Sequence, residues 1–283
     1  MVLGEIHLIK YHALGNDYLF LDSATFDKPS SEFIKQICHR NFGIGSDGLL
    51  YGGYVNGQFK LTIFNPDSSI AEISGNGTRI FARAMFDLGL INIGQKFEIL
   101  TNFRTVSCCL MAADCISVNM GSPSFEAPNI PIVGKDGANI TINGRTYKYY
   151  SVSLGNPHCV IFVDAILHED VLSDGPILEK NIAFPEKTNV QFAHIIDSEN
   201  ISIEIWERGA GYTLASGSSA CAVFSVARKL KICFSRVTVH MPGGDLLLLE
   251  NSNETITQTG PVVKIADCEV GIKDLPTEKL HQM

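Results

Sequence analysis

Apolar and polar residues alternate along many short stretches of this chain, and a few longer stretches have helical spacing instead. Residues 59–64 alternate, and the polar turn at residues 74–79 (Ser-Gly-Asn-Gly-Thr-Arg) then opens a helix-like run. The same order recurs about half the chain later, where residues 201–206 alternate and the turn at residues 216–218 (Ser-Gly-Ser) opens a run to Leu230. The pattern predicts two copies of one strand–turn–helix unit.

Both polar turns are predicted to lie at the N-terminus of a helix. Unpaired backbone N–H groups and the positive end of the helix dipole make such a position suitable for an anion. Two units that face each other would point both helix N-termini at one small ligand. We therefore expect a single ligand-binding cleft that contains Ser74, Gly75, Asn76, Ser216, Gly217 and Ser218.

The remaining pattern indicates many strands and few helices. Residues 5–22 are typical of a hairpin with a turn at 13–17, and residues 30–40 and 165–180 have helical spacing. Strands are expected within 96–120, 127–150 and 190–192, and between the second turn–helix unit and about residue 265; Asn143–Gly144 predicts a hairpin turn. This succession predicts an α+β fold of two similar halves, each with a sheet wrapped around one central helix.

Composition narrows the class of protein. With 283 residues, 45% hydrophobic and 18% charged, the chain is large and apolar enough to fold into two domains. Its net charge of −8 argues against nucleic acid or an anionic membrane as the main partner. No apolar run approaches the length of a membrane span, and the N-terminus lacks a signal pattern, so we expect a cytoplasmic protein with its eight cysteines reduced.

Several familiar catalytic motifs are absent from the sequence. Residues 43–48 match G-x-G-x-x-G but follow a helix and lead into a strand, the reverse of a dinucleotide-binding loop, so we interpret them as a loop that positions Asp47. There is no G-x-S-x-G, no H-E-x-x-H and no Walker loop. Cys108, Cys109 and Cys115 lack paired zinc-ligand spacing and lie in an alternating segment, which favours buried thiols over a metal site.

Polar side chains suited to an amino acid occur in several predicted turns. Amides and a guanidinium can bind the carboxylate and the ammonium of a zwitterion. Taken singly, Asn16 is explained by turn chemistry, His158 by a core histidine and the pair Glu207–Arg208 by a surface ion pair. The collection favours an amino-acid site, and its members outside the two helix turns are Asn16, Asn65, Asn156, His158, Asn189, Glu207 and Arg208.

These residues lie in segments that resemble the diaminopimelate epimerase family along nearly the whole chain. The segments occur in the family's order: residues 10–17 (KYHALGND), 64–67 (FNPD), 75–77 (GNG), 155–158 (GNPH), 184–189 (FPEKTN), 207–211 (ERGAG) and 220–222 (ACA). The resemblance implies interconversion of LL- and meso-diaminopimelate by a two-base proton transfer, on the route to lysine and peptidoglycan, without pyridoxal phosphate or metal. It also implies a cytoplasmic homodimer.

The sequence differs from the family at the positions of the two catalytic bases. In the family they are cysteines, and they align with Ser74 and Ser216, while His158 and Glu207 stand where the family supports its thiols. A serine hydroxyl is a far poorer base than a thiolate at a helix N-terminus. Either both cysteines were replaced deliberately, or the chain is a natural relative with another task. Since the rest of the site is kept, we favour replacement, with impaired activity.

Other implications of the resemblance concern substrate and domains. It assigns Asn65, Asn189 and Arg208 to the non-reacting end of diaminopimelate, and it places Gly48 where some members carry Gln. We expect two pseudo-symmetric α/β domains, each a mixed, barrel-like sheet around a central helix, with the ligand between them. One domain is 1–119 with 264–283, and the other is 120–263. The alternatives are a racemase of another amino acid and a non-catalytic binding protein.

Overall fold

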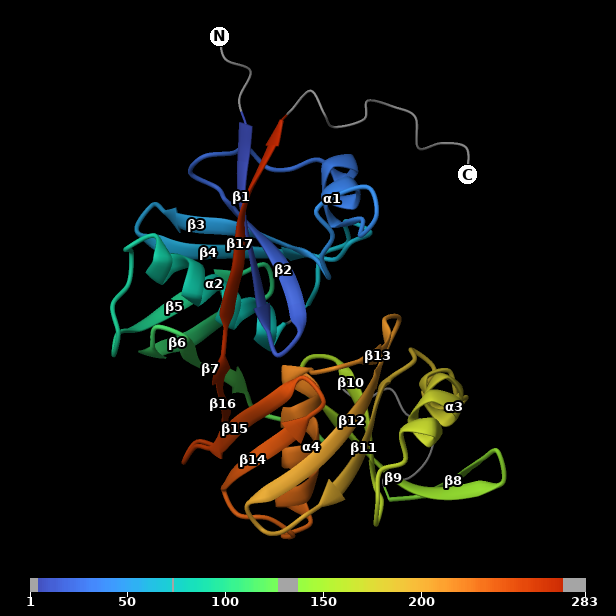
Figure 1. Cartoon of the computed structure of the whole chain (residues 1–283). Coiled ribbons are helices and arrows are strands. Elements are labelled where there is room, and N and C mark those ends of the chain that lie inside the picture. The colour runs from blue at the N-terminus through green and yellow to red at the C-terminus, as the bar shows by residue number, and fades with distance from the viewer. Residues whose placement is uncertain (1–4, 73, 127–136, 272–283) are drawn as a thin grey trace.

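The computed structural model describes residues 5–72, 74–126 and 137–271 (Figure 1). Two sequence-based expectations extend beyond these ranges. The first ten residues of the strand region predicted at 127–150, residues 127–136, lie outside the described residues. So do residues 272–283 of the predicted C-terminal segment.

The first half of the chain folds as a sheet that is interrupted by two helices. Its elements are β1 (Glu5–Ala13), β2 (Asn16–Asp22), α1 (Ser31–Cys38), β3 (Leu49–Val55), β4 (Gln58–Phe64), α2 (Gly75–Asp87), β5 (Lys96–Thr101), β6 (Thr105–Ala112) and β7 (Cys115–Gly121). Strands β1 and β2 pair antiparallel, β2 and β3 parallel, β3 and β4 antiparallel, and β4 and β5 parallel. Strands β5, β6 and β7 then form an antiparallel meander.

The second half repeats this succession. Its elements are β8 (Asn139–Ile142), β9 (Arg145–Ser153), β10 (Pro157–Phe162), α3 (His168–Glu179), β11 (Asn189–Ile195), β12 (Asn200–Glu207), β13 (Gly211–Thr213), α4 (Gly217–Lys229), β14 (Arg236–Met241), β15 (Gly244–Glu250), β16 (Ile256–Pro261) and β17 (Val263–Gly271). Strands β9 and β10 pair antiparallel, β10 and β11 parallel, β11 and β12 antiparallel, and β12 and β14 parallel. Strands β14, β15 and β16 then pair antiparallel, so the order of pairings is the one found from β1 to β7. The two halves are therefore pseudo-symmetric.

The halves are joined by two strand pairings. Strand β7, the last of the first half, pairs antiparallel with β16, and β17 returns along β1 (Figure 1). The mixed sheet thus runs continuously from one half into the other. The domain limits at residues 119/120 and 263/264 stay predictions.

Each half surrounds one central helix. Ten of the thirteen residues of α2 and eleven of the thirteen of α4 are buried, so both helices are covered on almost every side. One cluster of buried apolar side chains extends from the sheet around α2 to the sheet around α4. The predicted α+β fold with a sheet around a central helix in each half is confirmed.

The other two helices lie at the outside of their halves (Figure 1). Helix α1 contributes Phe33, Ile34 and Ile37 to a smaller apolar cluster, and Ser30 caps it by accepting the Phe33 N–H at 3.2 Å. Helix α3 packs on a third cluster through Val171 and Leu178. Within the described ranges, no helix combines the length and the apolar character needed to span a bilayer.

Four residues predicted in turns lie in strands instead. Asn16 begins β2, His158 is the second residue of β10, Asn189 begins β11 and Glu207 ends β12. The backbone pairing of each strand continues beyond its alternating apolar residues. A polar residue at the end of such a strand therefore looks like a turn residue in the sequence. The turn predicted at 13–17 shortens to Leu14 and Gly15, whose φ values are 56° and 86°. Asn143 and Gly144 form the predicted hairpin turn, with φ values of 50° and 79°.

Candidate active site

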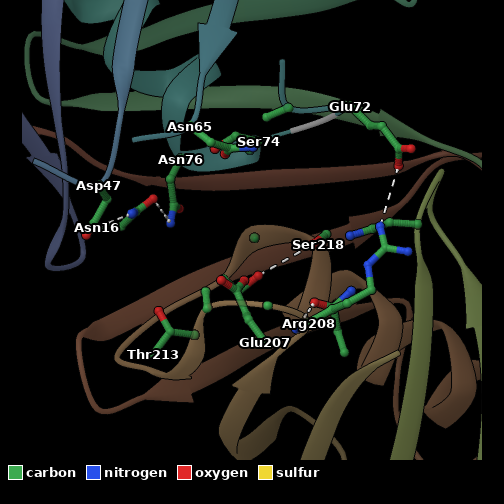
Figure 2. Close-up of a pocket in the computed structure, with 18 of the residues that line it drawn as sticks. Asn16, Asp47, Asn65, Glu72, Ser74, Asn76, Glu207, Arg208, Thr213 and Ser218 are labelled. Atoms are coloured by element: carbon green, nitrogen blue, oxygen red, sulfur yellow. Dashed lines mark hydrogen bonds and ion pairs between the residues drawn. The ribbon is translucent and has the colours of Figure 1, made fainter. Parts of the chain in front are cut away.

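A cavity of about 720 Å³ lies between the two halves, where α2 and α4 begin (Figure 2). Residues from both halves line it, including every predicted site residue except His158. Those lining residues are Asn16, Asn65, Ser74, Gly75, Asn76, Asn156, Asn189, Glu207, Arg208, Ser216, Gly217 and Ser218. Folding therefore brings into one place residues that are as far apart in the sequence as Asn16 and Ser218.

Ser74 and Ser216 are the N-cap residues of the two central helices. The Ser74 Oγ accepts the Gly77 N–H at 2.9 Å, and the Ser216 Oγ accepts the Ser219 N–H at 3.4 Å. Both have extended backbone, with φ of −141° and −142°. Each hydroxyl thus lies at the positive end of a helix dipole, where a negative charge is stabilised.

Glu207 lies beside Ser216 at the end of β12. Burial raises the pKa of its carboxyl above the ordinary value, and a hydrogen bond with Ser216 opposes that rise. The Ser216 hydroxyl is also 3.4 Å from that of Ser218. A carboxyl group with a raised pKa, in contact with a residue that lines the cavity, is suited to exchanging protons there.

A chain of hydrogen bonds holds the amides of Asn16 and Asn76. Asp47 Oδ2 accepts from Asn16 Nδ2 at 2.8 Å, and Asn16 Oδ1 accepts from Asn76 Nδ2 at 3.1 Å. Asn76 Oδ1 in turn accepts from Arg79 Nη2 at 2.6 Å. Because the chain runs from a guanidinium to a carboxylate, each amide has one favourable orientation. Arg79 is fully buried, and burial lowers its pKa to about 10, so it remains charged at neutral pH.

The loop at residues 43–48 positions Asp47. It connects α1 to β3, as the sequence indicated, rather than a strand to a helix. The Asp47 N–H donates to the Asp17 carbonyl at 2.9 Å, and Arg40 Nη2 donates to Asp47 Oδ1 at 2.6 Å. The G-x-G-x-x-G match is therefore not a dinucleotide-binding loop.

His158 lies behind the cavity, next to Asn156. Gln191 Nε2 donates to His158 Nδ1 at 3.1 Å, which leaves His158 Nε2–H to donate to Asn156 Oδ1 at 2.9 Å. Burial, with the charge of Arg208 as a second cause, lowers the His158 pKa to about 3. The neutral ring thus orients Asn156, whose amide lines the cavity. A direct catalytic role of His158 stays a prediction.

The turn that carries Glu207 and Arg208 is held from two sides. Asn189 Oδ1 accepts the Arg208 N–H at 3.0 Å, and Asn189 Nδ2 donates to the Pro157 carbonyl at 2.9 Å. The buried carboxylate of Glu179 accepts the Gly209 N–H at 3.1 Å and, through its other oxygen, the Trp206 Nε1–H at 2.9 Å. Glu179 was not predicted from the sequence, because thirty residues separate it from Gly209.

Arg208 and Glu72 face each other across the cavity (Figure 2). Arg208 Nη2 is 3.9 Å from Glu72 Oε2, and both side chains keep substantial solvent contact. Asn65 lines the same cavity and donates from Nδ2 to Ser69 Oγ at 2.9 Å. An exposed ion pair of this kind is weak, so the guanidinium is available to a ligand carboxylate.

Tyr18 and Glu72 also line the cavity and were not predicted from the sequence. Tyr18 comes two positions after Asn16 in β2 and Glu72 two positions before Ser74. Alternate residues of a strand point to the same side, so Asn16 was a signal for Tyr18. Tyr18 Oη lies 3.4 Å from Ser74 Oγ.

The family model for diaminopimelate epimerase matches residues 8–126 and 150–265. The chain belongs to the diaminopimelate epimerase family. It is 46% identical over 269 residues to diaminopimelate epimerase 2 of Nostoc sp., covering 92% of this chain and 94% of that one. It is 35% identical over 272 residues to the diaminopimelate epimerase of Moorella thermoacetica, covering 92% and 97%. The resemblance seen in the sequence is confirmed.

The fold of this diaminopimelate epimerase family member also occurs in more distant proteins. A phenazine biosynthesis protein of the PhzF family from Bacillus anthracis matches with a TM-score of 0.70 at 12% identity, over 94% of this chain and 99% of that one. Among the described residues, no group of three or more His, Cys, Asp or Glu side chains is placed to hold a metal ion. The expectation that the reaction uses no metal or other cofactor stays a prediction.

Proposed function

We propose that this chain binds diaminopimelate in the cavity, with Ser74 and Ser216 in the positions of the two bases of an epimerase. The observation that carries the proposal is that each serine caps a central helix of a different half and lines the same cavity. The two-base reaction needs this arrangement, because one group removes the α-proton from one face while the other donates a proton to the opposite face.

The proposed substrate contacts follow from the charges of the cavity. The α-carboxylate lies at the two helix N-termini, where Gly75, Asn76, Gly217 and Ser218 present backbone N–H groups. The distal carboxylate binds Arg208, because a guanidinium can make a bidentate charge-assisted contact with it. Asn65 and Asn189 lie on the same side of the substrate in this proposal.

The two serines make this chain a weak catalyst in our proposal. When the α-proton leaves, the C–H bond breaks and the base gains the proton, so the base must be present in its deprotonated form. A thiol has a reference pKa near 8.5, and a helix N-terminus lowers it further. An aliphatic hydroxyl is far less acidic, so its anion is hardly populated at neutral pH. The serines can hydrogen-bond the substrate without exchanging its α-proton at a useful rate.

The test is α-proton exchange into deuterated water, followed by NMR under reducing conditions. We expect slow exchange by the unchanged chain, slow one-sided exchange by Ser74→Cys or Ser216→Cys alone, and turnover only when both changes are combined. The gain of the double variant should exceed the product of the single gains, since the two groups act as a unit. A matched control combines Ser74→Cys with Ser225→Cys, because Ser225 is buried in α4 away from the cavity lining.

The outcomes separate this proposal from its alternatives. Exchange with another amino acid and not with diaminopimelate would identify a different racemase. Binding without exchange in the double variant would identify a binding protein. If the unchanged chain exchanges the α-proton as fast as the double variant, Ser74 and Ser216 do not stand at the base positions.

The proposal also includes a place in lysine and peptidoglycan biosynthesis, a cytoplasmic location and a homodimer. These follow from the family resemblance rather than from a contact in the structure. Light scattering after gel filtration tests the homodimer, which should have twice the 30.9 kDa mass of the chain. A mass of 30.9 kDa at working concentration would contradict it.

A further inference from the structure

Tyr18 is a buried tyrosine whose hydroxyl reaches one of the two base positions. Its side chain is 7% exposed and lines the cavity, and its Oη lies 3.4 Å from the Ser74 Oγ. Fifty-six residues separate the two in the sequence. Strand β2 therefore presents a phenol directly to the N-terminus of α2, which belongs to the same half.

The ring occupies its place because residue 48 is a glycine. A Cβ atom at Gly48 would lie 2.7 Å from Cε1 of Tyr18 and would also meet the Phe64 carbonyl oxygen. Gly48 directly precedes β3, which runs parallel to β2, and its carbonyl accepts the Leu19 N–H at 3.1 Å. The glycine thus leaves room beside the sheet in which the phenol extends to Ser74.

The distance allows either hydroxyl to donate in the contact between Tyr18 and Ser74. Burial is the main cause that raises the Tyr18 pKa above its ordinary value; the hydrogen bond with Ser74 opposes this rise, and the negative charges of Glu207 and Asp47 add to it. The hydroxyl therefore keeps its proton at neutral pH. Ser74 Oγ already accepts the Gly77 N–H at 2.9 Å. When the phenol donates, both lone pairs of Ser74 are used, and its own O–H can point into the cavity.

We propose that Tyr18 is a positioning residue for the acid–base group at position 74, to which its phenol donates a hydrogen bond. This inference rests on the proposed function, which assigns proton transfer to that position. A donor stabilises the deprotonated form of an acid–base group. The neighbour of Ser216 is instead the carboxyl of Glu207, whose ionised form accepts from the Ser216 hydroxyl. The two base positions are thus unequal, and position 74 has the environment that favours the deprotonated form.

The other charged groups around position 74 are known from the structure. Glu72 and Arg104 line a small pocket beside Ser74, and Asp47, Asp67, Glu207 and Arg208 line the main cavity with it. Tyr18→Phe leaves all six in place and removes one oxygen atom. A comparison of variants with and without this change therefore isolates the hydroxyl.

The experiment measures the pKa of a thiol introduced at position 74. The rate of alkylation by iodoacetamide is followed from pH 5 to 10 in Ser74→Cys and in Ser74→Cys combined with Tyr18→Phe. Peptide mass spectrometry reads only the introduced thiol, since the chain has eight cysteines of its own. Loss of the hydrogen bond should raise this pKa by about one unit. The matched control is Ser216→Cys with and without Tyr18→Phe, where the pKa should not change.

An unchanged thiol pKa at position 74, or an equal shift at position 216, would overturn the inference. If the combined variant does not fold, a second measurement on the serine chain replaces it. Tyrosine labelled with ¹³C at Cζ should show a shifted resonance for Tyr18 alone among the eight tyrosines when Ser74→Ala removes its partner. No shift would also overturn it. Neither measurement uses a substrate, so a failure of diaminopimelate binding is a separate result that concerns the proposed function.

Discussion

Gly75 and Gly217, the first residues of the two central helices, pack against the same side chain. That side chain is Gln258 of β16, which is fully buried and whose Nε2 lies 2.9 Å from the Met120 sulfur of β7. A Cβ atom at either glycine would collide with the Gln258 amide. The two glycines thus let both helix N-termini approach the strand pair that joins the halves, and both glycines line the cavity.

We predict that Gly75→Ala destabilises the protein by about 1–3 kcal/mol, because the added methyl group overpacks a buried contact. Combining it with Gln258→Ala should recover part of the loss, since that change removes the colliding amide. Gly77→Ala is the matched control in the same helix. Its Cβ would lie 3.1 Å from a Leu50 methyl carbon and 3.2 Å from the Ser74 Oγ, which are longer contacts than those of a Cβ at Gly75 with Gln258, so the loss should be smaller. Thermal melting of the variants checks this, and an unchanged melting temperature for Gly75→Ala would contradict it.

Arg208→Lys should weaken diaminopimelate binding by about tenfold, because lysine lacks the planar fork that binds a carboxylate with two parallel hydrogen bonds. Isothermal titration calorimetry on the serine chain measures the affinity without interference from turnover. Arg228→Lys is the control, because Arg228 pairs with Glu250 away from the cavity lining. Unchanged affinity for Arg208→Lys would indicate that the true ligand is a shorter amino acid.

Stability should fall as the pH falls below about 6.5, in part because of His158. Its pKa is about 3 in the folded protein and near 6.5 in the unfolded chain, so between these values only the unfolded chain binds the proton. The contribution of His158 to the free energy of unfolding is complete above pH 6.5. Below that pH it falls by up to about 1.4 kcal/mol per pH unit. Urea unfolding at pH 7, 6 and 5 should show a shallower loss for His158→Gln. Parallel losses in the two proteins would contradict the prediction.

Glu179→Gln should weaken ligand binding although Glu179 does not line the cavity. The change removes one of two acceptors that hold the Trp206 and Gly209 N–H groups, and so loosens the turn that carries Arg208. We expect a loss of about 1–3 kcal/mol in stability and a weaker affinity for diaminopimelate.

The control for this prediction is Asp174→Asn in the same helix. Asp174 is also a buried carboxylate, and it accepts hydrogen bonds from Asn143 and Tyr147 at 2.7 and 2.6 Å. Asp174→Asn should cost similar stability and leave the affinity unchanged. Equal losses of affinity in both variants would show that binding follows global stability rather than the Arg208 turn.

Local patterns in the sequence determined most elements of this protein. The alternation at 59–64 and at 201–206 predicts β4 and β12, because residues that share a face of a strand recur every second position. Ser74 and Ser216 were identifiable as helix starts, since a serine before a helical run satisfies the free N–H groups of the first turn. Their recurrence half a chain apart indicated the two halves and the shared cleft.

Only the tertiary structure decided which side chains meet. Tyr18 contacts Ser74, Glu179 holds the turn at Gly209, and Gln258 separates the starts of α2 and α4. Each contact joins different elements, and it depends on strand register and on how a helix rotates against its sheet. The hydrophobic period of one segment carries no information about either. His158 shows the same limit: its sequence position suggested a residue of the cleft, and the packing of β10 against β11 placed it behind Asn156.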